Sequence, residues 1–229
     1  MSSRIKVISS MATRQVLADL VERFQRQSPH SVCVESVGGV DAARRVRSGE
    51  AFDAVVLAAD TIDQLIAAGA IVPGSRVDLV RCGVSMAVRA GALRPDISSE
   101  EAVKRAVLGA ASLSYSTGPS GVQLARLFER WGIADAIHDH LVQAPPGVPV
   151  GSLVADGQVE LGFQQLSELM HLSGIDVIGP LPPTIQIITT FSAGLAAASQ
   201  QAEAVHAWLD FMISPAAVQA KRNNGMEPA

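Results

Sequence analysis

The sequence predicts an α/β protein of two lobes, each built on a mainly parallel sheet flanked by helices. Strand-like and helix-like segments alternate through residues 5–69, a pattern that specifies a parallel sheet with helices on its faces. Residues 54–59 form a continuous apolar run, which is typical of a central parallel strand. Residues 77–80 and 84–89 are strand-like with no helix between them. We interpret this passage as the crossing into a second α/β lobe.

The first lobe is predicted to contain three strand–helix pairs. Its first helix carries apolar residues at helical spacing, and Gly49 and Gly69 follow the other two helices, where glycine commonly ends a helix. The expected strands lie at 5–10, 32–37 and 54–59, and the expected helices at 13–25, 41–48 and 62–68.

The second lobe is predicted to begin near Arg81, Cys82 and Gly83, which interrupt the two strand-like runs. Ser98 or Ser99 can cap the helix that follows, because acids come directly after them. The terminal helices are expected to complete the first lobe, which gives domains at 1–82 plus 190–229 and at 83–189. The remaining elements are expected as strands at 112–116, 141–143, 161–165, 175–178, 185–190 and 193–198 and as helices at 99–108, 120–131, 150–155, 166–172, 202–213 and 215–223.

Composition limits the partners and the location of the protein. A chain of 229 residues that is 48% hydrophobic can bury a sizeable core. Its net charge of −4 and its 4% aromatic content disfavour nucleic acid as a partner. No run approaches the roughly 18 apolar residues of a membrane span. The start lacks the apolar stretch of a secretory signal, so we expect a cytoplasmic protein, or a periplasmic one if a leader was removed.

Cysteine and histidine do not point to a disulfide or a metal site. Cys33 and Cys82 each lie beside apolar strand-like sequence, and we expect both to be free and buried. His138, Asp139 and His140 lack evident further ligands, so no metal is predicted. With no glycine-rich phosphate fingerprint either, no organic cofactor is expected.

A strand–turn–helix junction at 112–131 is the first candidate binding site. Ser116 ends the strand-like run, Ser120 stands where the helix N-cap is expected, and Gly121 would let a ligand approach the backbone closely. Free amide groups at a helix start hold anions without any basic side chain. The alternative is an ordinary capped junction without a ligand.

Two further junctions lie in the first lobe. Ser9, Ser10 and Thr13 surround the first one, and each hydroxyl can either cap the helix or bind a carboxylate. Arg14 lies in the first helical turn, where the helix dipole disfavours a cation, which indicates an anionic partner or a solvated arginine. The second junction carries Gly38-Gly39.

The short helix after Gly38-Gly39 has a basic character. Arg44, Arg45 and Arg47 lie on it. They either bind an anion or form a solvated helix face whose positive charge is balanced by the acids Glu35, Asp41 and Glu50.

The chain resembles the molybdate-binding-protein family. The resemblance rests on IKVISSMATRQVLADLVERF, ARRVRSGEAFDAVVLAAD, the PSG junction and VELGFQQLSEL, in that order along nearly the whole chain. It implies the two-lobed type 2 periplasmic-binding fold of ABC-importer solute-binding proteins, with the ligand in a cleft between the lobes. In the family, hydroxyls and amides at the strand–helix junctions hold an oxyanion, together with a tyrosine after a late strand.

Three positions depart from the family pattern. Ala12 stands where the family has a serine, Gly38-Gly39-Val40 replaces a serine run, and Gln165 takes the place of the tyrosine. Each lost charge-assisted hydrogen bond costs an oxyanion about 1–3 kcal/mol, so molybdate and tungstate are disfavoured. SYSTGPSG, LGFQQLSEL and GPLPPTIQ with TTFSAG resemble the branch that contains aconitate isomerase. Gln165 is kept as an expected ligand contact.

Two functions of different classes follow from the resemblance. The first is a cofactor-independent isomerase that shifts a C=C bond in a small tricarboxylate, a reaction that needs a base and donors to the developing negative charge. Its base could be Glu35, Asp41, Glu168 or Tyr115, and the sequence does not choose among them. The second is a solute-binding protein that delivers a small anion to an ABC importer, which requires export.

Overall fold

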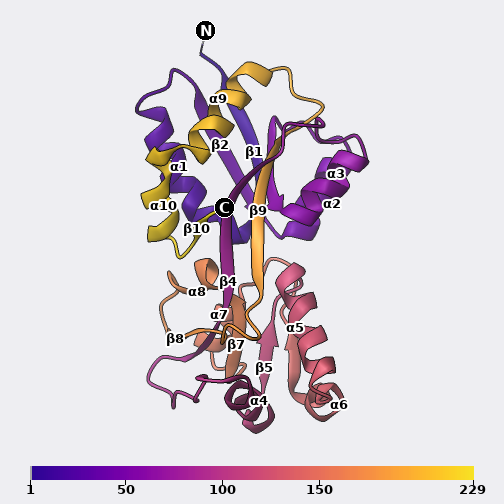
Figure 1. Ribbon diagram of the computed structural model, residues 1–229, viewed down its shortest axis with the longest axis vertical. Helices are drawn as coiled ribbons and strands as arrows, with labels where there is room; N and C mark the ends of the chain where they lie inside the picture. The colour runs from indigo at the N-terminus through magenta and orange to yellow at the C-terminus, as the bar shows by residue number, and fades with distance from the viewer. Residues whose placement is uncertain (1) are drawn as a thin grey trace. The chain divides into compact units, whose positions relative to one another are not determined.

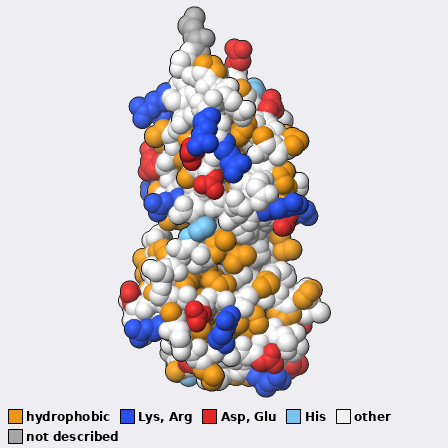
Figure 2. All heavy atoms as spheres, turned by 90° about the vertical axis from the view of Figure 1, so that its left-hand side faces the viewer, with side chains coloured by type: hydrophobic (Ala, Val, Ile, Leu, Met, Phe, Trp, Pro, Cys, Tyr) orange, Lys and Arg blue, Asp and Glu red, His pale blue; other side chains and the backbone are white. Residues whose placement is uncertain are grey.

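The computed structural model describes residues 2–229, and the chain in it forms two compact units (Figure 1). Unit 1 comprises the described residues up to Cys82 together with Thr189–Ala229, and unit 2 comprises Gly83–Ile188. Among residues 2–229 no helix is both long enough and apolar enough to cross a bilayer. On the face drawn in Figure 2, Lys and Arg are interspersed with Asp and Glu, so that face carries no continuous basic surface.

Unit 1 is built on the strand order β2-β1-β3-β9. The first three strands run parallel, and β9 pairs antiparallel with β3. Helices α2 and α3 cover one face of this sheet, and α1, α9 and α10 cover the other (Figure 1). The strands are β1 (Arg4–Ser10), β2 (Ser31–Val37), β3 (Ala54–Ala58) and β9 (Ile188–Leu195), and the helices are α1 (Arg14–Gln25), α2 (Gly39–Arg47), α3 (Ala59–Ala67), α9 (Ala202–Ile213) and α10 (Val218–Asn223).

Unit 2 has the strand order β6-β5-β7-β4, with β8 paired to β4. Strands β6, β5 and β7 run parallel, whereas β4 runs antiparallel to β7 and β8. The strands are β4 (Val77–Arg89), of which residues 83–89 belong to unit 2, β5 (Leu113–Tyr115), β6 (Leu141–Gln143), β7 (Leu161–Gln165) and β8 (Ile175–Pro180), and the helices are α4 (Glu100–Gly109), α5 (Pro119–Arg130), α6 (Ala134–Ile137), α7 (Val150–Ala155) and α8 (Leu166–Leu169).

The larger core of unit 2 lies between one sheet face and the helices α4 to α6. Phe128 of α5 packs edge-on against Phe163 of β7, with ring centroids 6.2 Å apart. Leu113 and Val107 are fully buried in the same cluster. A smaller cluster around Val150 and Val154 covers the other face through α7.

Several sequence expectations were wrong in detail. The two strand-like runs at 77–80 and 84–89 are one continuous strand, β4, because Arg81, Cys82 and Gly83 are extended like their neighbours. The segments expected at 185–190 and 193–198 are replaced by the single strand β9. The sequence did not indicate α6, the 3-10 helices at Met11–Thr13, His138–His140 and Pro215–Ala217, or the short strand β10 (Glu227–Pro228), which pairs with β4.

The two cysteines differ in burial. Neither forms a disulfide among the described residues, and Cys82 is buried as expected. Cys33 is exposed, which contradicts the expectation of burial. The reason is that β2 pairs only with β1 and so forms an edge of the sheet, where alternate side chains face solvent.

Gly121 is needed for packing within unit 2. A Cβ atom at this position would lie 1.8 Å from the Ser116 carbonyl oxygen and 2.9 Å from Tyr115 Cδ2. The start of α5 therefore sits directly on the end of β5. The chain's own backbone thus approaches Gly121 closely, and its expected approach to a ligand stays a prediction.

We predict that Gly121→Ala lowers the free energy of unfolding by about 1–3 kcal/mol, because backbone must shift to admit the methyl group. Urea denaturation monitored by circular dichroism measures the change. Gly109→Ala, in α4, is the matched control, since a Cβ there meets no atom within 4 Å. The control should be neutral or stabilising by up to about 1 kcal/mol. Equal effects of the two substitutions would contradict this account.

Candidate functional site

The first candidate edge lies in unit 1, where β1 and β2 end side by side. Their parallel register pairs Ser9 with Ser36 and Ser10 with Val37. The Ser9 hydroxyl is fully buried and shares a hydrogen bond of 2.7 Å with the Ser36 hydroxyl. The Ser10 side chain instead lies beside Gly39, where a Cβ would be 3.8 Å from Ser10 Cβ.

The Ser10 hydroxyl oxygen is buried and has no hydrogen-bond partner within residues 2–229. The residue keeps 8% of its surface exposed. A buried hydroxyl without a partner costs free energy unless something pairs with it. Such a group at the end of a strand, in front of a helix, is suited to bind an oxygen atom of a ligand.

Three helical segments of unit 1 begin where the parallel strands end. The 3-10 helix at Met11–Thr13 follows Ser10, α2 follows Gly38, and α3 follows Ala58. Within the described chain no side chain caps any of these three starts. By contrast, the Ser99 hydroxyl caps α4 by accepting a hydrogen bond from the Ala102 amide at 3.2 Å. Uncapped amide groups at several helix starts favour an anion at this edge.

Thr13 and Arg14 hold different positions at the same junction. The Thr13 hydroxyl is buried and donates to the Ser10 carbonyl oxygen at 3.1 Å, so it stabilises the turn. Arg14 is exposed and is the first residue of α1. Of the two, Arg14 therefore has the side chain that remains accessible.

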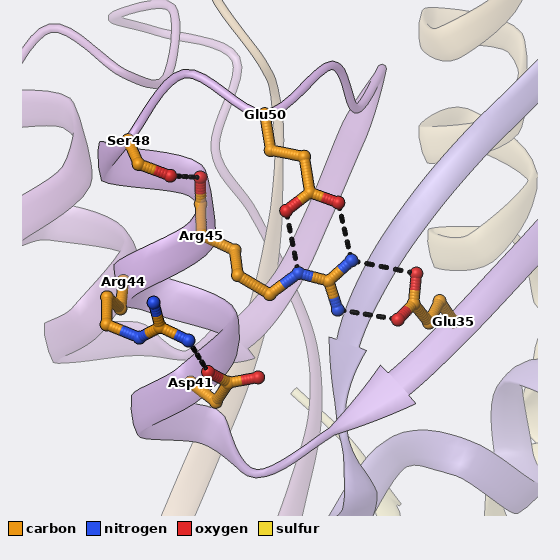
Figure 3. A network of polar contacts seen from close by, with 6 residues as sticks. All are labelled: Glu35, Asp41, Arg44, Arg45, Ser48 and Glu50. Carbon is orange, nitrogen blue, oxygen red and sulfur yellow. Dashed lines mark hydrogen bonds and ion pairs between the residues drawn. The ribbon is translucent and has the colours of Figure 1, made fainter.

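Arg44 and Arg45 of α2 are paired with acids (Figure 3). Arg45 donates to Glu35 of β2 at 2.5 Å and to Glu50 of the following loop at 2.7 Å, and its guanidinium also lies over the Phe52 ring. Arg44 pairs with Asp41 one turn earlier. Of the two interpretations of this helix, the structure favours the face balanced by acids.

The second candidate edge lies in unit 2, where β5, β6 and β7 end. Ser116 follows β5 and is half-buried. Ser120 is buried, but it is the second residue of α5, and Gly118 is the N-cap. The expectation that Ser120 caps this helix was wrong because Pro119, which has no amide hydrogen to lose, takes the first helical position.

Gln165 is the last residue of β7 and the N-cap residue of α8, and it is buried. It pairs in the sheet with Val84, which belongs to the core beneath α5. Since side chains alternate along a strand, Gln165 and Phe163 share the face that α5 covers. Gln164 therefore points to the opposite face, toward α7.

Gln164 connects three elements at the second edge. Its Oε1 accepts a hydrogen bond from the Val150 amide at the start of α7 (2.9 Å), and its Nε2 donates to Glu168 Oε1 on α8 (2.8 Å). Burial raises the pKa of Glu168 to about 7, against the smaller opposing effect of the Gln164 hydrogen bond. The sequence did not predict this cluster, although the i,i+4 spacing of Gln164 and Glu168 was a usable signal.

The four candidate acid–base groups have different surroundings in the structure. Hydrogen bonding to Arg45 lowers the pKa of Glu35, and Asp41 is paired with Arg44. Tyr115 packs against the core of unit 2. Burial raises the pKa of Glu168 into the neutral range.

Comparison with known proteins gives consistent results along nearly the whole chain. Residues 5–227 match the family described as bacterial extracellular solute-binding protein. The chain is 36% identical to a protein named aconitate isomerase from Pseudomonas sp. over 230 aligned residues, 98% of this chain and 87% of the relative.

Solved structures show the same fold. The periplasmic molybdate-binding protein of Azotobacter vinelandii matches with a TM-score of 0.80 at 19% identity, over 97% of this chain and 98% of that one. The sulfate-binding protein of Mycobacterium tuberculosis matches with a TM-score of 0.79 at 15% identity, over 99% and 87%. The predicted two-lobed α/β fold of periplasmic binding proteins is confirmed, as is the resemblance to the molybdate-type family and its aconitate-isomerase relative.

The raised pKa of Glu168 predicts a stability change with pH. The ordinary pKa is 4.5, and the folded value is about 7. The protonated form is thus the favoured one in the folded state. Its stabilising contribution is complete below about pH 4.5 and is lost as the pH rises through about 7, at about 1.4 kcal/mol per pKa unit.

We therefore expect the free energy of unfolding of the wild-type protein to fall by up to about 3 kcal/mol between about pH 5 and about pH 8. Glu168→Gln should not show this fall. Urea titrations of both proteins at these two pH values measure it. Glu129→Gln, on the exposed face of α5, should keep the wild-type pH dependence. A Glu168→Gln protein with the wild-type slope would show that this carboxyl titrates normally.

Proposed function

The chain belongs to the family of bacterial extracellular solute-binding proteins, and from this we propose that it binds a small organic polycarboxylate anion. The observation that carries the proposal is the unpartnered Ser10 hydroxyl beside the uncapped helix starts of unit 1. Carboxylate oxygens accept hydrogen bonds from amides and hydroxyls alike. A polycarboxylate offers several such oxygens on one small molecule.

An organic anion fits this edge better than a metal oxyanion does. The second junction offers Gly38 and Gly39 where hydroxyl donors would be needed to replace the hydration shell of a tetrahedral oxyanion. Val40, the second residue of α2, is 65% exposed. An accessible apolar side chain beside amide donors suits a ligand that has both carboxylates and a carbon skeleton.

Within this class we propose an aconitate-isomerase-like activity, supported by the relative of that name at 36% identity. The reaction is a cofactor-independent allylic shift: a C–H bond breaks next to the C=C bond, and a new C–H bond forms at the far end of the allylic system. The negative charge spreads onto a carboxylate between the two steps. Amide donors that are already oriented toward that carboxylate lower the barrier without reorganising.

The alternative function is a solute-binding component of an ABC importer that carries a small anion. The family description favours it, because the family is one of extracellular solute-binding proteins. It shares the binding chemistry of the isomerase and lacks the turnover.

We predict that purified protein converts trans-aconitate to its cis isomer, followed by proton NMR through the vinyl signals. Catalytic turnover without added metal or cofactor supports the isomerase. Saturable binding by calorimetry with no turnover would leave the importer component. If the protein neither binds nor turns over any member of a panel of di- and tricarboxylates, the proposed ligand class itself is overturned.

Ser10→Ala should separate ligand affinity from stability. Loss of a hydrogen bond to a charged ligand weakens binding by about 1.5–3 kcal/mol, or about tenfold to a hundredfold. The unliganded protein should keep or gain stability, because the hydroxyl has no partner to lose. Calorimetric titration with the bound carboxylate and urea unfolding measure the two effects.

Ser114→Ala is the matched control for Ser10→Ala. Ser114 also carries a buried, unpartnered hydroxyl within the described residues, but it is 0% exposed inside β5 and cannot reach a ligand. Its replacement should leave the affinity unchanged. Unchanged affinity in Ser10→Ala as well would show that the edge of unit 1 does not bind the ligand.

A further inference from the structure

Glu168 is held in place at one oxygen atom only. Gln164 Nε2 donates to Oε1 at 2.8 Å, and the same amide side chain is fixed at its other end by the Val150 amide at 2.9 Å. The carboxyl group is therefore oriented by a side chain that is itself buried in β7. This arrangement fixes the direction of the second oxygen, Oε2.

Oε2 is available for chemistry. It makes no hydrogen bond or ion pair with residues 2–229, and the Glu168 residue is half-buried and keeps some exposure to solvent. No cation of the described chain is paired with Glu168. An oriented carboxylate with one free oxygen and no counter-ion keeps its basicity.

Glu168 also lies at the edge where unit 2 presents its other candidate groups. Parallel pairing aligns Tyr115, the last residue of β5, with Phe163 of β7, so both strands end toward the same edge of the sheet and β7 continues to Gln165. Glu168 follows the end of β7 within one helical turn, as Ser116 and Ser120 follow the end of β5. Ligands of open α/β sheets bind at such carboxyl ends of strands.

We propose that Glu168 is the residue that takes up and returns the proton in the allylic isomerisation, and that Gln164 is its positioning residue. This inference rests on the proposed isomerase function. Oε2 removes a proton from the carbon next to the C=C bond, and the electron pair of that C–H bond delocalises over the allylic system onto a carboxylate. The protonated carboxyl then gives the proton to the far allylic carbon, the double bond moves by one position, and Glu168 is a carboxylate again.

The environment of Glu168 suits both half-reactions. Burial raises its pKa to about 7, where a group serves as base and acid with equal ease at neutral pH. The elements packed against α8 are β7, α7 and β8. Of these, β7 and α7 contain no ionisable side chain. Strand β8 contains Asp176, whose carboxylate accepts a hydrogen bond from the Gly91 amide. Asp176 is not among the causes of the raised Glu168 pKa.

The test compares Glu168→Gln, Glu168→Asp and Glu129→Gln with the wild-type protein. Proton NMR of trans-aconitate in D₂O gives kcat and the exchange of the allylic hydrogen, and calorimetry gives Kd. We expect Glu168→Gln to lose at least about a hundredfold in kcat and in exchange, with Kd within about threefold of wild type. Glu168→Asp should recover part of kcat and shift the ascending limb of the pH profile, which we expect near pH 7 in the wild type. Glu129→Gln should match wild type throughout.

Three other results would overturn the inference, and each does so differently. A Glu168→Gln protein with wild-type kcat and exchange rejects Glu168 alone and leaves the isomerase standing. A variant that loses kcat and affinity in parallel assigns Glu168 to binding or structure. A wild-type protein that binds trans-aconitate without turnover or exchange removes the isomerase function together with this inference.

Discussion

Parallel pairing of strands is the constraint on which both candidate edges depend. Because β1 and β2 run in register to Ser10 and Val37, the helical segments that follow must start side by side. The same holds for β5 and β7 in unit 2. Helix starts bring amide groups with partial positive charge, and without capping side chains these amides stay open. The proposed recognition of an anion at this edge therefore requires no cationic side chain.

In this chain, which has a net charge of −4, the cationic side chains of α2 have a structural use. Arg45 ties β2 to the loop before β3 through Glu35 and Glu50 (Figure 3). Its charge is therefore used to fix the position of α2 against its neighbours. The start of the same helix, at Gly38 and Gly39, has no capping side chain among the described residues.

Periodicity and turn chemistry were enough to predict most of the fold. The strands Leu141–Gln143 and Leu161–Gln165 and the helices Val150–Ala155 and Ala202–Ile213 lie at the residues expected, because their apolar spacing is unambiguous. Cys33 was misjudged because a sequence does not reveal which strand is at the edge of a sheet.

The candidate site was less accessible to sequence reasoning. Serine and glycine at 9–14, 38–39 and 116–121 mark junctions, but only the coordinates show that Ser9 pairs with Ser36 while Ser10 pairs with nothing among the described residues. Likewise, burial raises the pKa of Glu168 and Gln164 orients its carboxyl group, and both effects come from packing that local sequence does not carry.

The lone hydroxyl of Ser10 has a consequence for how the protein evolves or is engineered. Natural proteins tolerate locally unfavourable groups where function requires them, and stabilising substitutions at such places usually remove activity. Under the proposed ligand role of Ser10, a laboratory selection for heat resistance alone would accept alanine at this position and discard ligand recognition with no visible change of fold.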